Sequence, residues 1–227
     1  MGTSMKSAVF LQVRLDSSRL PRKALKVIEG KTVIEHAMLS LRNIPLDNYV
    51  IVTAEGDQTE LTPLAEKCGF SVFAGDRQDV LKRYIDAGRV YEPDIIIRAT
   101  GDNPLVAWEP AAELLAFLKN QEETDYTAML GIPVGCGVEI FRRRALEKTF
   151  PLTEAPYDHE HVTPYIYNNP EVFSLYYHRH LPELTQRVTL DTVEDFIRIS
   201  CIFRTLYRGS TIPFESLKDY LISNDTQ

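Results

Sequence analysis

A cationic loop near the N-terminus has the clearest chemical potential, and it reads QVRLDSSRLPRKAL over residues Gln12–Leu25. It follows a short apolar run, and its Arg19 and Lys23 are suited to contact a triphosphate group. The small Ser17 and Ser18 let backbone N–H groups approach phosphate oxygens, as in anion-binding turns. The loop therefore predicts an anion site, although basic loops also occur as plain solvated surface.

Two acidic positions complete the pattern. Asp102 lies in TGDNPL and Asp191 in LDTVED, and each follows a strand-like run. Asp102 also fits a side-chain turn, while Thr192 and Asp195 have the spacing of a helix capping box, which leaves Asp191 as the metal candidate. Carboxylates that hold a divalent metal, beside cations that neutralise a polyphosphate, are what phosphoryl or nucleotidyl transfer requires.

The hydrophobic pattern predicts the elements that must position these residues. Short β-branched runs alternate with helix-period segments at Thr32–Ile44 and Gln78–Tyr91, which is typical of an α/β fold with a mainly parallel sheet. Ligands of such sheets bind beyond the carboxyl ends of the strands, where the loop and both aspartates lie. The predicted strands are Ala8–Val13, Tyr49–Thr53, Ser71–Phe73 and Asp94–Thr100.

The pattern changes after a helix predicted at Trp108–Gln121. We interpret residues 1–227 as one domain with a small inserted α+β subdomain at about 126–186. The elements expected in this half are strands at Tyr126–Leu130, Val138–Phe141 and Arg187–Leu190, and helices at Arg144–Thr149, Thr192–Tyr207 and Phe214–Ser223.

Composition excludes several classes of protein. The net charge of −7 over 227 residues disfavours a broad nucleic-acid-binding face, but it is compatible with one basic pocket for a small anion. The three cysteines show no disulfide or zinc spacing, which favours a reducing cytoplasm. No apolar run reaches the roughly 18 residues of a membrane span, so no membrane partner is expected.

Other motifs are weaker. EGKTV contains GKT, but Leu25 stands where a phosphate-binding P-loop needs glycine. The alternating pairs His159/His161 and His178/His180 have no evident third metal ligand. Cys136 has no convincing base partner, so a cysteine nucleophile is not expected.

The motifs resemble those of a known enzyme family. QVRLDSSRLPRKAL is similar to the signature R-x-x-S-x-R-L-P-x-K-x-L of cytidylyltransferases that make CMP-activated sugars. The resemblance is greatest to the spore coat polysaccharide biosynthesis branch, with the 3-deoxy-manno-octulosonate and acylneuraminate enzymes as more distant relatives. Further matching segments, in family order, are VFAGDRQDVLKRYIDAG, IIRATGDNPLV, EHVTPYIYNNPE and VTLDTVEDF.

The resemblance implies a Rossmann-like, GT-A-like nucleotidyltransferase sheet and assigns roles by position. Asp102 and Asp191 would bind Mg²⁺. Asp79 and Arg83 would border the nucleotide. The residues expected to cradle the CTP phosphates are Arg14, Ser18, Arg19 and Lys23, and those expected towards the acceptor are Glu139, His161 and Tyr165.

Two departures from the family pattern stand out. Relatives usually have glycine where this chain has Arg22, so either the loop tolerates a side chain there or an extra cation faces the ligand. The branch often reads G-L-D-V-E near the acceptor, whereas this chain reads GCGVE over Gly135–Glu139. The lost aspartate leaves the identity of the acceptor open.

The function we expect is transfer of CMP from CTP to an anionic acceptor: a sugar acid, a sugar or polyol phosphate, or a phosphonate. A nucleotide-sugar-dependent glycosyltransferase is one alternative, although its D-x-D signature is not found after a predicted strand. A non-catalytic nucleotide-binding protein is the other. The Tyr-rich stretch VTPYIYNNPEVFSLYYH is either subdomain core or, as the relatives suggest, the interface of a homodimer.

Overall fold

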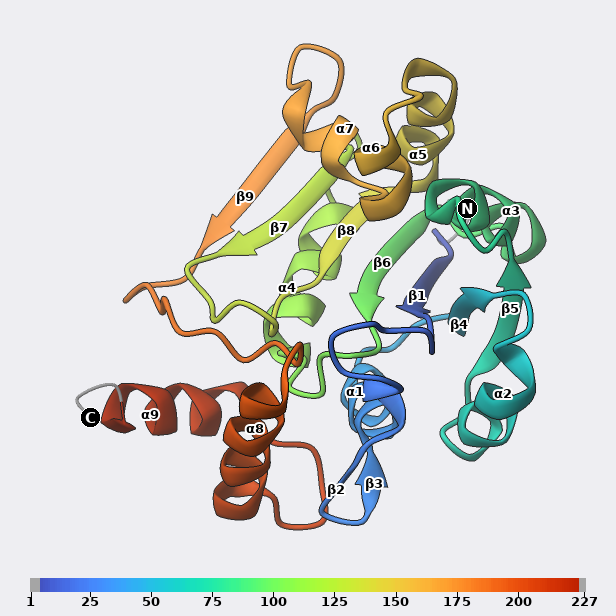
Figure 1. Ribbon diagram of the computed structural model, residues 1–227. Coiled ribbons are helices and arrows are strands. Elements are labelled where there is room, and N and C mark those ends of the chain that lie inside the picture. The colour runs from blue at the N-terminus through green and yellow to red at the C-terminus, as the bar shows by residue number, and fades with distance from the viewer. Residues whose placement is uncertain (1–4, 225–227) are drawn as a thin grey trace.

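A computed structural model describes residues 5–224, with a seven-stranded sheet at its centre (Figure 1). The inner strand β1 (Ser7–Val13) is almost entirely buried, as expected for an apolar strand covered on both faces. The strand order is β5-β4-β1-β6-β8-β7-β9. The other strands are β4 (Asn48–Ala54), β5 (Ser71–Gly75), β6 (Ile95–Thr100), β7 (Tyr126–Leu130), β8 (Glu139–Arg142) and β9 (Leu175–Arg179).

Strand direction determines which residues share an edge. Neighbouring strands are parallel except at β8, which is antiparallel to both β6 and β7. The predicted mainly parallel α/β sheet is therefore confirmed. Gln12 of β1 lies opposite Thr100 of β6, so these two strands end at the same edge. Because β8 is reversed, its first residue, Glu139, lies opposite Arg98 near that edge.

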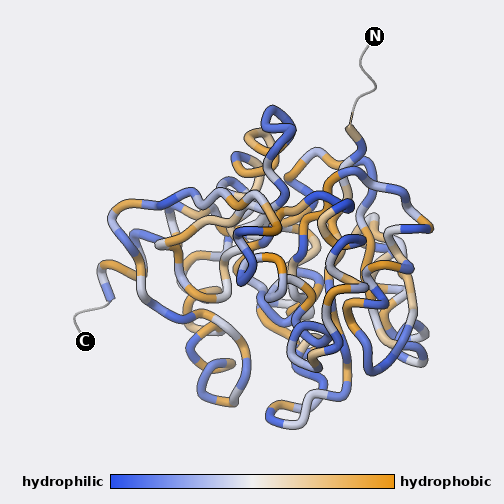
Figure 2. The backbone as a smooth tube through the Cα atoms, turned by 90° about the horizontal axis from the view of Figure 1, so that it is seen from above, coloured by the Kyte–Doolittle hydropathy of each residue, from blue (hydrophilic) through white to orange (hydrophobic). Residues whose placement is uncertain are grey.

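Helices cover both faces of the sheet. Apolar side chains of α1 (Val33–Leu41), α2 (Gln58–Lys67) and α4 (Trp108–Lys119) form one core with it. The opposite core contains residues of the helices α3 (Val80–Tyr91), α5 (Arg143–Thr149) and α7 (Pro164–Asn168). The helix α6 (Pro156–His161) has no buried residue and contacts α3. Hydrophobic and hydrophilic residues alternate along the chain, as expected for elements with one buried face (Figure 2).

A third core lies beside the sheet. It joins α8 (Val193–Leu206) and α9 (Phe214–Asn224) to residues near the short hairpin of β2 (Val27–Ile28) and β3 (Lys31–Thr32), at the bottom of Figure 1. Two single-turn 3₁₀ segments, Lys23–Leu25 and Phe150–Leu152, occur in the connections. Among the helices within residues 5–224, none is long and apolar enough to cross a membrane.

The predicted capping box at the start of α8 is present. The Thr192 side chain accepts from the Asp195 backbone N–H, and the Asp195 carboxylate accepts from the Thr192 backbone N–H. The same carboxylate also accepts from the backbone N–H of Asp191 at 2.9 Å. The cap therefore fixes the backbone that carries the predicted metal ligand.

The second half differs in part from the sequence prediction. Arg187–Leu190 is not a strand, because its pairing with the rest of the fold is an isolated bridge between Arg187 and Val134. The predicted insertion contributes β7, β8 and β9 to the main sheet. The helices α2, α6 and α7 and the strands β2, β3 and β9 were not among the elements predicted.

Candidate active site

The cationic loop and the Asp102 turn leave the sheet side by side. Gly101 donates its backbone N–H to the carbonyl of Gln12 at 2.8 Å. A Cβ on Gly101 would come within 3.0 Å of the Val13 side chain, so a side chain there would press against β1. The glycine lets the two loops begin in contact, and this brings Asp102 beside the loop that contains Lys23.

Lys23 joins the two predicted metal ligands. Its ammonium lies 2.5 Å from an oxygen of Asp102 and 2.9 Å from an oxygen of Asp191. It also donates to the carbonyl of Leu190 at 2.9 Å. Lys23 and Asp191 are mostly buried, so their charges are poorly screened by water. The cationic loop, the Asp102 turn and the segment that carries Asp191 therefore meet at the Lys23 ammonium.

Asp191 receives further positive charge. Arg19 donates to one of its oxygens at 3.0 Å, and Arg187 donates to the other at 2.8 Å. Burial alone would raise the pKa of Asp191, but the hydrogen bond and charge of Lys23, with Arg187 and Arg19, hold that pKa below its usual value. Asp191 is therefore an anion at neutral pH. The sequence did not single out Arg187.

The two carboxylates fit an Mg²⁺ site that substrate completes. One cation, the ammonium of Lys23, already contacts both carboxylates, so one metal ion can be reached by the same pair. Within residues 5–224, no group of three His, Cys, Asp or Glu side chains is placed to hold a metal. Mg²⁺ often binds through one or two carboxylates together with substrate phosphates and water. Asp102 and Asp191 would hold the metal, and a polyphosphate would supply the remaining oxygens.

Arg22 points away from this junction. Its backbone is left-handed, with φ of 55°, a conformation that favours glycine and so accounts for the family preference. Its guanidinium forms a two-fold pair with the Glu60 carboxylate of α2. The loop therefore tolerates a side chain at this position, and the side chain is held on α2 instead of facing Asp102 or Asp191.

The start of the loop is attached to neighbouring elements. The Leu15 backbone N–H donates to Asp57 at 2.9 Å. The exposed Arg14 lies 3.7 Å from Asp16 and 3.8 Å from Glu160 of α6. Between Arg14 and Arg19, Ser17 is partly exposed and Ser18 is exposed.

Asp79 and Arg83 shape the segment that follows β5. Asp79 caps α3 by accepting from the Lys82 backbone N–H at 2.8 Å, and it pairs with His159 of α6 at 2.8 Å. Arg83 is buried and donates to the carbonyls of Asp76 and Arg77. Arg83 therefore supports the loop from beneath, and its guanidinium is not presented at the surface.

Glu139 is the centre of a polar network on the neighbouring strands. One of its oxygens accepts from Arg98 at 2.5 Å. The other accepts from Tyr126 and from Thr163, both at 2.7 Å. The sequence did not single out Arg98 or Tyr126. A charged residue within the apolar run of β6 was the available signal, since buried charges need partners.

Thr163 reaches Glu139 through an unusual turn. Val162 has φ of 73°, and the Thr163 backbone N–H donates to the carbonyl of His161 at 2.9 Å, which closes a γ-turn. Two of the residues predicted to face the acceptor, His161 and Tyr165, lie on either side of Val162. The ring of His161 packs 4.4 Å from that of Tyr157, and Tyr165 packs edge-on against Phe173. The observed contact to Glu139 is made by Thr163.

A pocket of about 290 Å³ lies beside Glu139 and reaches Asn103, the residue that follows Asp102 in the chain. Arg98, Asn103 and the loop between β7 and β8 line it. Gly135 in that loop has φ of 104°, and a Cβ there would lie 2.8 Å from the Thr189 backbone nitrogen. The following Cys136 is fully buried, and burial raises the pKa of its thiol, as expected for a core cysteine. Gly135, which this chain shares with the family pattern, therefore allows close packing against the segment before Asp191.

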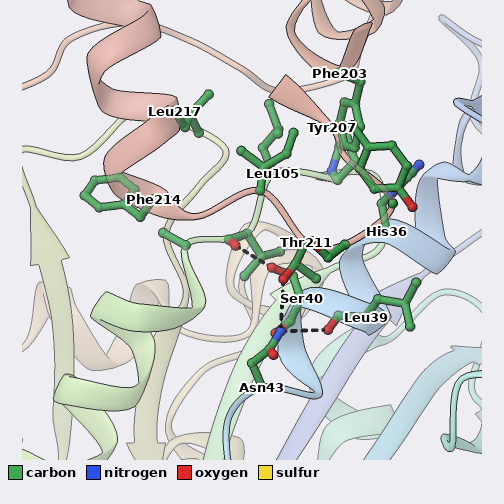
Figure 3. Close-up of a pocket in the computed structure, with 16 residues that line it drawn as sticks. His36, Leu39, Ser40, Asn43, Leu105, Phe203, Tyr207, Thr211, Phe214 and Leu217 are labelled. Carbon is green, nitrogen blue, oxygen red and sulfur yellow. Dashed lines mark hydrogen bonds between the residues drawn. The ribbon is translucent and has the colours of Figure 1, made fainter. Parts of the chain in front are cut away.

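A separate cavity of about 250 Å³ lies between α1, α8 and the start of α9 (Figure 3). His36 and Phe203 form part of its wall, with ring centroids 4.3 Å apart. At the other end, the Asn43 amide donates to Leu39, Ser40 and Thr211. None of the predicted site residues lines this cavity.

Comparison with known proteins agrees with this geometry. A family model described as cytidylyltransferase matches residues 8–219. The spore coat polysaccharide biosynthesis protein SpsF of Bacillus subtilis is 30% identical over 213 residues, which cover 86% of this chain and 85% of that protein. A cytidylyltransferase structure from Leptospira borgpetersenii has a TM-score of 0.92 at 28% identity and covers 98% of this chain and 96% of that one.

A more distant structure shares the fold. The CMP:2-keto-3-deoxy-manno-octonic acid synthetase complexed with CTP has a TM-score of 0.71 at 14% identity and covers 88% of this chain and 99% of that one. The α/β sheet, with cations and carboxylates gathered at its carboxyl edge, defines a nucleotidyltransferase. The chain belongs to the cytidylyltransferase family, as its motifs indicated.

Proposed function

We propose that this enzyme transfers CMP from CTP to a small anionic acceptor and releases pyrophosphate, with Mg²⁺ as the metal. The junction of Lys23 with Asp102 and Asp191 is the observation that carries the proposal. It joins a phosphate-binding cation to a pair of metal-binding carboxylates at the edge of the sheet. Family membership supports CTP as the nucleotide. The acceptor is a sugar acid, a sugar or polyol phosphate, or a phosphonate.

In the proposed reaction, an acceptor oxygen forms a bond to the α-phosphorus of CTP. The bond from that phosphorus to the bridging oxygen breaks, and pyrophosphate leaves with the electron pair. A hydroxyl acceptor gives its proton to solvent, whereas an ionised acceptor has none to lose. Mg²⁺, when bound, neutralises charge on the phosphates. The protein's own task is to position the reactants and neutralise charge, which needs no nucleophilic side chain.

Each predicted residue has a place in this proposal. Asp102 and Asp191 hold the metal, and Asp79 and Arg83 shape the border of the nucleotide site. Glu139, with the segment of His161 and Tyr165, lies towards the acceptor. The residues proposed to bind the phosphates are Arg14, Ser17, Ser18, Arg19 and Lys23.

The proposal extends to the cellular setting. The similarity to SpsF supports a role in the biosynthesis of a cell-surface polysaccharide. We place the enzyme in the cytoplasm, where CTP is made, and expect a homodimer. The exposed Tyr176 and Tyr177 on the edge strand β9 are suited to such an interface.

The direct test is pyrophosphate release from CTP and Mg²⁺ with a panel of sugar acids, sugar phosphates, polyol phosphates and phosphonates. We expect release with at least one acceptor, and a loss of at least about 100-fold for Asp102→Asn. Asp219→Asn, an exposed residue on α9, makes the same charge change as a control. No release with any acceptor, together with no stabilisation of the protein by CTP and Mg²⁺, would disprove the proposal.

A further inference from the structure

Arg98 is a cation built into the sheet beside the proposed metal site. It lies on β6, two residues before the strand ends and four before Asp102. Its neighbours Ile96 and Ile97 are fully buried, and its own side chain is only 14% exposed. A charge in such a place costs free energy unless partners hold it. The contacts of Arg98 must therefore account for a charge at this buried position.

Glu139 is the ionic partner of Arg98, and other elements already satisfy its oxygens. One oxygen accepts from Arg98, and the other accepts from Tyr126 of β7 and Thr163 of the γ-turn. Contacts from three elements therefore hold the carboxylate in place. This arrangement suits Glu139 to orient the guanidinium, not to bind a ligand itself.

The guanidinium has unused donors. Its bond to Glu139 uses Nη1 alone. The Nε atom is buried and has no hydrogen-bond partner in the described part of the chain. Buried donors are almost always paired, so an unpaired one points to a missing acceptor. Nε–H and one N–H of Nη2 form the parallel edge of a guanidinium that binds a carboxylate or phosphonate through two hydrogen bonds.

The adjoining pocket has room for the group that would supply this acceptor. It measures about 290 Å³ and extends from Arg98 and Glu139 to Asn103, beside Asp102. Arg98 is the one Lys or Arg among the described residues that line it. Gly135 and Gly137 in the opposite wall occupy little of its space. The pocket therefore presents a single cation, and its lining extends to the residue next to Asp102 in the chain.

We infer that Arg98 binds the anionic group of the acceptor through its Nε and Nη2 edge, with Glu139 as the positioning residue. This inference rests on the proposed function. Arg98 and Thr100 are separated by about 7 Å along the strand, and Asp102 lies beyond the strand end. The group held by Arg98 is therefore distinct from the attacking oxygen. The acceptor class is a molecule that carries a carboxylate or phosphonate and a separate nucleophilic oxygen.

Arginine NMR tests the binding step directly. The protein is saturated with Mg²⁺ and the unreactive α,β-methylene analogue of CTP, which occupies the phosphate cradle. Glycolate or methylphosphonate is then added while the ¹⁵Nε–¹Hε signals of arginine are recorded. The Arg98 signal, assigned by its loss in Arg98→Lys, is expected to shift with at least one of these anions. The two probes distinguish a carboxylate site from a phosphonate site. A signal that stays fixed with both would overturn the inference.

Kinetics test the consequence for specificity. Each acceptor that the enzyme uses is compared with a neutral analogue that lacks the anionic group. Arg98→Gln is expected to raise KM for the anionic acceptor by about 10- to 100-fold and to abolish its advantage over the neutral one. The Kd for CTP should stay within about two-fold of the wild-type value. Arg204→Gln, an exposed arginine on α8, is the matched control.

The positioning role of Glu139 has its own signature. Glu139→Gln is expected to move the Arg98 Nε signal and to raise the acceptor KM, while Glu139→Asp recovers part of the loss. An Arg98→Gln enzyme that keeps its preference for the anionic acceptor would refute the inference, although CTP transfer would stand. If CTP does not bind, the proposed function fails, but the Arg98 signal still reports on anion binding.

Discussion

The Lys23 ammonium lies 2.5 Å from a carboxylate oxygen of Asp102. The same ammonium contacts Asp191, so a protein cation stands where the two proposed metal ligands meet. Two carboxylates this close repel each other without a counterion. Lys23 therefore offsets the repulsion between the two carboxylates, and in the proposed function Mg²⁺ would take over the same electrostatic role.

Removal of the Lys23 charge should expose this repulsion. We expect Lys23→Met, which keeps the aliphatic stem, to lower the free energy of unfolding by about 2 kcal/mol at low Mg²⁺. Millimolar Mg²⁺ without nucleotide should raise the melting temperature more in the variant than in the wild type. Differential scanning calorimetry measures both effects. If Mg²⁺ raised the melting temperature equally in the two proteins, the idea that the Lys23 ammonium and the metal occupy the same position would be contradicted.

The left-handed backbone at Arg22 predicts a tolerant position. Arg22→Gly relieves the conformational cost of φ at 55°, but it loses the exposed pair with Glu60 and adds freedom to the unfolded chain. We expect a melting temperature unchanged or a few degrees higher, with full activity. A large loss of activity would show that Arg22 takes part in nucleotide binding. Glu60→Gln separates the ion pair from the backbone effect.

Gly135 should be far less tolerant. In Gly135→Ala, the new methyl group meets the Thr189 backbone nitrogen at 2.8 Å and displaces the segment that leads to Asp191. We expect a loss of about 2 to 4 kcal/mol in the free energy of unfolding and weaker binding of Mg²⁺ with CTP. The matched control is Gly209→Ala, which also has positive φ but faces open space. Similar losses in the two variants would count against the close packing at Gly135.

The pair of His159 with Asp79 predicts a pH dependence. One ring nitrogen lies 2.8 Å from Asp79, and the other lies 3.0 Å from the Thr153 carbonyl, so the charged ring can donate to both. Burial lowers the pKa of His159, but these acceptors outweigh it and raise the pKa above 6.5. A raised pKa stabilises the fold below the unfolded value, and this stabilisation is lost as pH rises through the folded value.

We therefore expect the free energy of unfolding to fall as the pH rises from about 6.5 towards 8. His159→Gln should flatten that part of the curve, as measured by urea unfolding at a series of pH values. His161→Gln, two residues away, should keep the slope. A wild-type curve without slope in this range would argue against the charged pair.

The central fold could be predicted from the sequence because its signals are local. Alternating apolar runs predicted β1, β4, β5 and β6, and the T-x-x-D spacing predicted the cap of α8. Lys23 and Asp102 lie beyond the ends of β1 and β6, and these positions predicted that they meet. Asp191 joins them from a segment that is not a strand. The run Arg187–Leu190 has strand-like composition, but its partner is one residue of a distant loop, and no local pattern indicates that.

The proposed acceptor side was harder to predict because its contacts cross between elements. Arg98 and Glu139 are far apart in the sequence and meet because β8 pairs with β6. Thr163 reaches them through a turn whose φ is rare for valine. Hydrophobic periodicity carries no information on such contacts. The family motif therefore indicated the segment around His161 and Tyr165, but it did not identify Thr163 as the residue that hydrogen-bonds to Glu139.

Because β8 runs in the reverse direction, the proposed nucleotide half and the proposed acceptor half of the site are built by different loops. The proposed nucleotide half depends on the loops that leave β1 and β6, whereas the proposed acceptor wall is the loop that enters β8. Insertions or substitutions between β7 and β8 can reshape that wall while the β6 and β8 register stays in place. Variation in this loop away from Gly135, which packs against the segment before Asp191, would therefore change the proposed acceptor wall and leave the proposed nucleotide half unchanged.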